Sequence, residues 1–213
     1  GVLFGPGYLR DPNGNIVHVD GLPQIDPENK VLGNIQPDWT GGISFDFKYK
    51  GISLSTLIDA HQGGSIYSMT TTWGRYSGVL QETLLGRETG IIGDGVKNIG
   101  NATEPNYVAN DVVVAAESYN KAAFSNNLAE GSVFDASFVK LRQITLGVDL
   151  PSKWFGRNVF QGASVSLVGR NLAILHRNAP HIDPETGFSS SNSEQGQEFG
   201  QLPSTRSIGI NLN

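Results

Sequence analysis

The chain has 213 residues, a length that fits one sandwich or small barrel domain. Charged residues make up only 16%, below the roughly 25% of soluble domains, while 27 Gly and 10 Pro residues indicate strands and loops. The lack of Cys excludes disulfides, thiolate metal sites and a cysteine nucleophile, and the net charge of −5 argues against nucleic acid as a partner.

The first clear strand, near residues 42–49, separates apolar from polar residues. One face carries Ile43, Phe45, Phe47 and Tyr49, and the other carries Ser44, Asp46 and Lys48. Lys50-Gly51 predicts a very short turn, and alternation resumes over a second strand near 51–60. These two strands are expected to form a β-hairpin.

Two stretches around this hairpin lack a clear period. Residues 1–38 form a long stretch before the first strand, and residues 61–134 are rich in Gly, Ser, Thr and Asn. Within the second stretch, 111–124 is a predicted helix with Asn110 as its N-cap. Compact domains rarely contain connections of this length, which favours an architecture with long loops.

Three more strands follow. The third, near 137–150, changes its apolar phase, which predicts a β-bulge near Arg142-Gln143. The connection 151–161, containing Trp154 and Phe155, leads to a fourth strand near 163–175 with a second phase change at 169–171. A polar loop, 176–204, separates it from a last strand near 206–213.

Short and long connections therefore alternate, so all the long loops lie on one side of the array. Outer-membrane β-barrels have this asymmetry, with short periplasmic turns and long extracellular loops. It predicts an all-β fold with Trp154 and Phe155 in the inner aromatic girdle. Five strands cannot close a barrel, so other sequence is expected to supply the remaining strands.

Several segments, in this order, resemble the C-terminal region of the SusC/RagA family of TonB-dependent outer-membrane transporters. They are Val31–Gly42, Tyr49-Lys50, Leu57–Asp59 with Gln62–Gly64, Asp135–Gly147, Ser166–Leu172, Asp183–Glu185 and Leu202–Gly209. Together they are spread over almost the whole chain.

The resemblance implies a 22-stranded barrel of the outer membrane of a Gram-negative bacterium, with this chain as roughly its last five strands and their loops. It implies import of an oligosaccharide or other glycan, or else a peptide, energised by TonB and assisted by a SusD-like surface lipoprotein. The plug and most of the barrel would lie outside residues 1–213, and both ends are expected to be truncated. Gln143 departs from the usual Glu of the family, which puts a charge role at the bulge in doubt.

Five strand residues are candidates for the polar lining of the lumen: Asp46, Lys48, Lys140, Arg142 and Arg170. They would either contribute to a polar substrate path or simply pair with carboxylates of the plug and neighbouring strands. The second interpretation is favoured, because charges inside a barrel wall need partners.

The longest loop contains Trp73, Arg75 and Tyr76, a combination of aromatic rings and a guanidinium that is common at interfaces. These residues are candidates for contact with the substrate or with the lipoprotein lid.

No metal, cofactor or enzyme activity is predicted. His176, His181, Asp183 and Glu185 lack a spacing typical of a metal site, and turn chemistry explains the Asp-rich segments 11–15 and 183–187. The catalytic motifs of hydrolases, zinc proteases and P-loop proteins are absent from the sequence.

The alternative hypothesis is a secreted, soluble β-sandwich that binds glycans, with the apolar strand faces packed between two sheets. The two hypotheses differ in what covers these faces. In a barrel wall, Phe45, Phe47, Tyr49, Ile208 and Ile210 are expected to be exposed; in a sandwich they would be covered by a second sheet.

Overall fold

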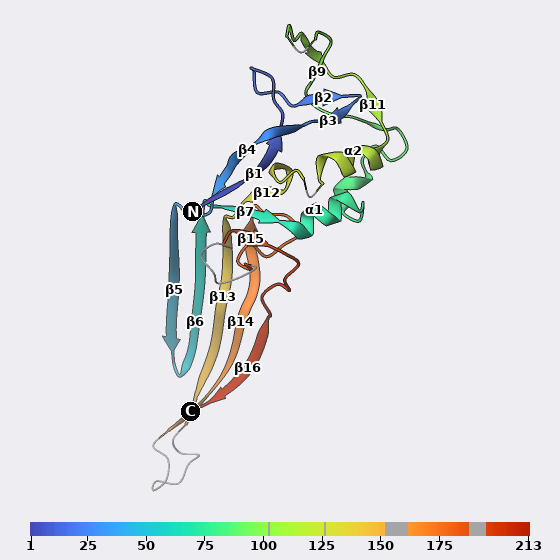
Figure 1. The fold of residues 1–213 in the computed structure, drawn as a ribbon. Helices are drawn as coiled ribbons and strands as arrows, with labels where there is room; N and C mark the ends of the chain where they lie inside the picture. Colours follow the sequence, from blue (N-terminus) through green and yellow to red (C-terminus); the bar gives the residue numbers. More distant parts are fainter. Residues whose placement is uncertain (102, 126, 152–161, 188–194) are drawn as a thin grey trace.

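The computed structural model describes residues 1–101, 103–125, 127–151, 162–187 and 195–213. Its largest sheet is an antiparallel sheet of long strands, and a second part of the chain extends from one end of this sheet (Figure 1). The strands, in spatial order, are β16 (Ser207–Leu212), β14 (Ala163–Arg177), β13 (Phe138–Leu150), β6 (Ile52–Gln62) and β5 (Trp39–Tyr49). Each begins and ends within three residues of the span expected from the alternation.

The turn between β5 and β6 is the predicted two-residue hairpin. Tyr49 and Ile52 are paired, and Lys50 and Gly51 have φ of 47° and 83°. Turns with positive φ at both central residues match the twist of antiparallel strands, and glycine adopts this conformation without steric cost.

Both predicted phase changes are bulges. Against β6, the register of β13 shifts between Leu141 and Gln143, so Arg142 is the extra residue. Against β14, the same step leaves Asn171 and Leu172 opposite Arg142, so there the extra residue lies on β14. On β14, Asn171 accommodates the irregularity with φ of 50°, in the left-handed region that Asn tolerates better than most residues.

One face of the sheet is apolar across all five strands. Phe47, Leu54, Leu146, Leu167 and Ile210 are successive cross-strand partners, and each is between 42% and 73% exposed. Among the described residues, no second sheet covers this row. The observation contradicts the soluble sandwich, in which these side chains would form the core.

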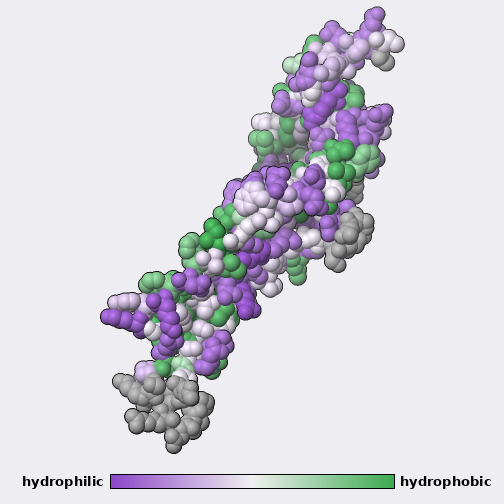
Figure 2. Space-filling view, turned by 90° about the vertical axis from the view of Figure 1, so that its left-hand side faces the viewer, coloured by the Kyte–Doolittle hydropathy of each residue, from purple (hydrophilic) through white to green (hydrophobic). Residues whose placement is uncertain are grey.

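The opposite face is polar. Its cross-strand rows contain small and hydrophilic residues, such as Asp46 with Ser55, and Gly147 with Ser53 and Ser166. Because β5 lies at an edge, both of its faces are exposed within this chain. Seen from the β5 side, the molecule is elongated, and polar and apolar residues both reach its surface (Figure 2).

The described residues of 1–38, 63–137 and 178–206, here called the cap, gather at the end of the sheet opposite the Lys50-Gly51 turn (Figure 1). The stretches expected to be long loops contain several short strands and helices. They are β1 (Val2–Tyr8), β2 (Val17–Val19), β3 (Leu22–Pro23), β4 (Ile25–Asn34), β7 (Ser65–Ser68), α1 (Met69–Tyr76), η1 (Gln81–Leu84), β8 (Ile91–Ile92), β9 (Val96–Asn98), β10 (Tyr107–Ala109), β11 (Val113–Val114), α2 (Ala116–Ala123), η2 (Glu130–Ser132), β12 (Val133–Asp135) and β15 (Gln197–Glu198).

The helix expected over 111–124 is shorter than predicted. It begins at Ala116, because Val113 and Val114 pair with β8 instead of entering the helix. Asn110 is not its N-cap; its side chain donates to the Gly93 carbonyl and accepts from the Val112 amide. Tertiary pairing of a β-branched run thus overrides the helix prediction.

A small hydrophobic core lies within the cap. It consists of Ile66, Ala136, Ala179 and Ile182, with Phe134 packed against it. None of the helices in the described part of the chain is long and apolar enough to cross a membrane.

Candidate functional site

A cluster of five charged residues lies on the polar face where the sheet meets the cap. Asp59 comes from β6, Lys140 and Arg142 from β13, and Asp183 and Glu185 from the turn after β14. The cluster therefore joins two strands to a segment of the cap.

Lys140 is deeply buried, with its side chain 2% exposed. Its ammonium group lies 2.6 Å from an Asp183 carboxylate oxygen and 2.7 Å from one of Glu185, and it also lies over the Phe138 ring. A buried ammonium is tolerated only when it is paired and hydrogen-bonded, and this one has two carboxylates.

Arg142, placed at the bulge, bridges the two strands and the turn. Its Nε donates to Asp59 at 2.8 Å, and both of its terminal nitrogens donate to Glu185. A planar guanidinium can bind a carboxylate through two parallel hydrogen bonds, and the bulge turns Arg142 toward its partners.

Asp183 fixes the segment before the last strand. Its Oδ2 accepts hydrogen bonds from the Ser204 amide and hydroxyl, and its Oδ1 accepts from Lys140 and from the Glu185 amide. Burial alone would raise the pKa of Asp183, but the hydrogen bonds from Lys140 and Ser204 lower it to about 2. Hydrogen bonds from Arg142 likewise lower the pKa of Glu185.

The other three residues predicted on the polar face lie outside this cluster. Lys48 lies opposite the small Ser53, and its Nζ is 2.7 Å from Oδ2 of Asp149. Both charged groups are exposed. Asp46 lies opposite Ser55. Arg170 lies exposed between Gln143 and Ser207, and no carboxylate of the described ranges lies within ion-pair distance of it.

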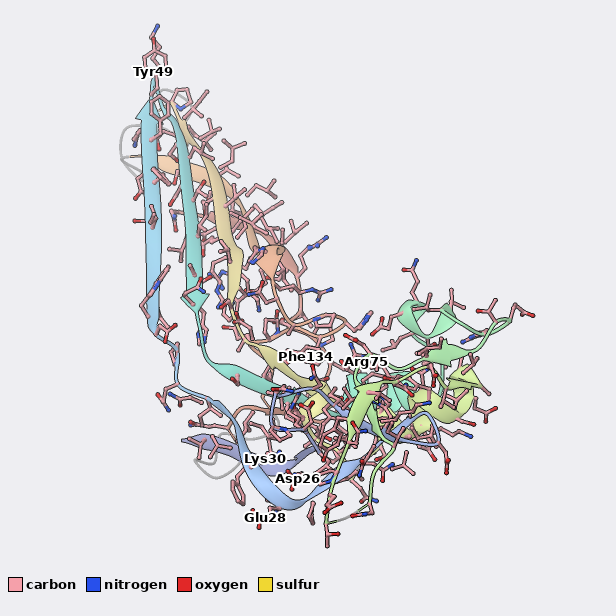
Figure 3. The ribbon with its side chains drawn as sticks, turned by 90° about the horizontal axis from the view of Figure 1, so that it is seen from above. Asp26, Glu28, Lys30, Tyr49, Arg75 and Phe134 are labelled. Carbon is pink, nitrogen blue, oxygen red and sulfur yellow. The ribbon has the colours of Figure 1, made fainter. Side chains whose placement is uncertain are left out.

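The three residues predicted for substrate or lid contact separate in space. Arg75 is directed into the cap, near Phe134 (Figure 3), where its guanidinium binds Glu82 and the Gly131 carbonyl and lies over the Phe124 ring. Trp73 and Tyr76, at an i, i+3 spacing on α1, remain about half exposed, and Trp73 contacts the Phe199 ring.

Three of the residues considered for metal binding, His181, Asp183 and Glu185, are engaged otherwise. Asp183 and Glu185 bind cations of the sheet, and His181 lies 2.8 Å from Glu82. The Asp11 carboxylate accepts the amides of Asn13 and Asn15, as expected of an Asx turn. The described ranges contain no group of three residues suited to a metal. Trp154 and Phe155 lie outside the described residues.

Two important carboxylates were not singled out in the sequence. Asp59 continues the polar face of β6, so its orientation had a signal in the alternation. Glu198, only 1% exposed, accepts hydrogen bonds from Ser68 and Thr70 at the start of α1, about 130 residues away along the chain, and no local pattern indicates this contact.

The fold combines a folded cap with a sheet that has one apolar and one polar face, and within the described residues neither edge strand of this sheet has a further partner. The chain matches no protein-family model. It is 26% identical over 210 residues to TonB-dependent receptor P3 of Formosa agariphila, and 25% identical over 217 residues to TonB-dependent receptor P26 of the same organism. These matches include 95% and 99% of this chain, but it spans only about a fifth of each relative.

Solved structures agree on the fold. The RagAB peptide importer in its closed-closed state matches 99% of this chain and 22% of the matched chain, with a TM-score of 0.59 and 19% identity. The open-open state gives a TM-score of 0.57 over the same shares. The chain is a distant homologue of TonB-dependent receptors, which are transporters of the Gram-negative outer membrane and not enzymes.

Proposed function

We propose that residues 1–213 form five adjacent wall strands and the extracellular loops of a SusC/RagA-type import barrel. The observation that carries this proposal is the exposed apolar row from Phe47 to Ile210, which would meet lipid. An apolar face of this width in water would be an aggregation hazard, whereas hydrocarbon solvates it without cost. The unpaired outer edges of β5 and β16 would bind the remaining strands.

The polar face would then line the lumen and meet the plug. Asp46, Lys48, Lys140, Arg142 and Arg170 all belong to strands of the sheet, and the first two alternate with apolar residues of β5. The cluster around Lys140 is largely satisfied within the chain, which favours a structural role over direct contact with cargo.

The cap would face the outside of the cell. Trp73 and Tyr76 are the exposed aromatic residues of α1 and would contact either a SusD-like lipoprotein or the imported nutrient. The whole transporter would import an oligosaccharide or other glycan, with a peptide as the second candidate, using energy supplied through TonB. The description of RagAB as a peptide importer supports the second candidate.

The orientation of the sheet can be tested by spin labelling the full-length transporter in lipid bilayers. Leu146 and Thr145 are adjacent on β13, on opposite faces. A label on Cys at position 146 is expected to be accessible to oxygen dissolved in lipid, and a label at 145 to be shielded from it. If water-soluble reagents reached both positions equally, the proposed orientation of the sheet in a barrel wall would be wrong. Purification of the transporter with a bound lipoprotein would test the partner.

A further inference from the structure

A cavity of about 660 Å³ lies in the cap, between α1 with the turn after it and the beginning of α2. Its volume falls within the range of small-molecule sites. Tyr76, Thr83 and Asn120 supply an aromatic ring, a hydroxyl and an amide to the lining. None of the charged residues of the cluster around Lys140 lines it.

The charges around this cavity are mainly positive, although the chain as a whole has a net charge of −5. Arg75, Arg87 and Lys121 line it, against a single carboxylate, Glu117. Arg75 is neutralised by Glu82, and Lys121 by Glu117 at 2.6 Å. The remaining cation is Arg87.

Arg87 is held in place by neutral oxygens alone. Its Nε donates to the Thr83 carbonyl at 3.1 Å, and its Nη2 donates to the Gly78 carbonyl and the Thr83 hydroxyl. Among the described residues, no carboxylate lies within ion-pair distance of Arg87, and its Nη1 donates no hydrogen bond. A guanidinium that is fixed in orientation but not neutralised is prepared to bind an oxyanion.

The beginning of α2 also favours binding of an anion in the cavity. Ala115 occupies the N-cap position and makes no side-chain hydrogen bond to the first turn. The N–H groups of a first turn carry partial positive charge, and Ala115 and Ala116 both line the cavity.

We propose that this cavity binds a carboxylate or sulfate group of a small polar ligand, with Arg87 as the principal contact. Tyr76 would pack against the body of the ligand. This binding does not depend on the proposed import function, because it is a property of the cap and can be measured without transport.

Arginine footprinting of the full-length transporter in detergent tests the proposal. Phenylglyoxal modification is followed by peptide mass spectrometry, with sodium glucuronate, sodium sulfate or uncharged glucose added at constant ionic strength. Arg10 is the matched control, because this exposed cap arginine also donates to a backbone carbonyl, of Gly14, but has Glu130 as its carboxylate partner. Glucuronate, sulfate or both are expected to slow modification of Arg87 several-fold, whereas glucose leaves it unchanged and Arg10 is unaffected.

The two anions distinguish the source of the charge, since protection by glucuronate alone indicates a carboxylated ligand and protection by sulfate alone a sulfated one. Equal slowing at Arg87 and Arg10, or no slowing at either, would overturn the proposal. In a binding titration, Arg87→Gln is expected to lower the affinity for the protective anion about tenfold or more, because the variant loses a charge-assisted hydrogen bond. Lys97→Gln, which removes a partly buried cap cation outside the cavity, is expected to leave the affinity for the anion unchanged. The footprint of the protein without substitutions tests the proposal even if a variant fails to fold.

Discussion

Replacing Asp183 by Asn would remove one charge from the buried pair with Lys140 and leave the shape of the side chain nearly unchanged. The Asn oxygen could still accept from Lys140, but its amide group would then oppose the Ser204 amide, which now donates to Asp183. Lys140 would keep only Glu185 as a negative partner. The variant therefore tests whether the cluster holds the turn and the segment before β16 against the sheet.

Two routes give the magnitude. Lowering the pKa of Asp183 from 3.8 to about 2 corresponds to about 2 kcal/mol of stabilisation by the charged form. Removing one partner of a buried ion pair costs roughly 3–5 kcal/mol in general. Because Asn retains one acceptor, we expect the lower end, about 2 to 3 kcal/mol, which is roughly 30- to 150-fold in a local opening equilibrium.

Amide hydrogen exchange of the full-length transporter in bilayers is the appropriate assay, since it reports local opening. Exchange at Thr186 and Ser204 should accelerate by the factor given above. Glu117→Gln, which breaks an exposed pair with Lys121, is the matched control and should leave exchange in this turn unchanged. An Asp183→Asn protein whose exchange stays within twofold of the unmodified protein would refute the reasoning.

The same carboxylate predicts an acid dependence. A carboxyl group whose pKa is lowered by folding stabilises the fold above its unfolded pKa, near 4, and this contribution disappears as the pH falls toward 2. Exchange in the turn, measured relative to the intrinsic exchange rate at each pH, should therefore accelerate between pH 4 and pH 2. Asp183→Asn should lack this part of the pH dependence.

Four further predictions address the wall and the cap. Leu146→Arg should destabilise the barrel in bilayers by about 2–4 kcal/mol, and Thr145→Arg by clearly less, as measured by urea unfolding from vesicles. Gly51→Ala should cost about 1–2 kcal/mol in the same assay because φ is positive there, whereas Gly209→Ala, with open space around it, should be neutral. Arg75→Leu should make the cap sensitive to limited proteolysis, since it loses Glu82, the Gly131 carbonyl and the aromatic contacts together. Residues 1–213 expressed alone should not give a stable folded monomer in water, so a cooperative melt in detergent-free buffer would count against the barrel wall.

The strands of the sheet were predictable because their signals are local. Side chains alternate with a period of two along any strand, so Phe45, Phe47 and Tyr49 had to share a face. The turn at Lys50-Gly51 is also a local signal, because it separates two alternating runs. The bulge at Arg142 follows from the alternation, since a change of phase requires an extra residue.

The cap was not predictable to the same degree. Its strands are mostly two to four residues long, too short to show a period, and many pair with distant segments. The beginning of α2 was misplaced because Val113 and Val114 pair with β8, which no helical propensity reveals.

The sequence by itself determined which residues face each side of the sheet and where the sheet turns, because backbone geometry and local sterics set these features. Only the tertiary structure decided which charges meet. Lys140 and Asp183 are 43 positions apart, and Arg142 and Asp59 are 83 apart. Burial makes such partners obligatory, but the path of the chain selects them.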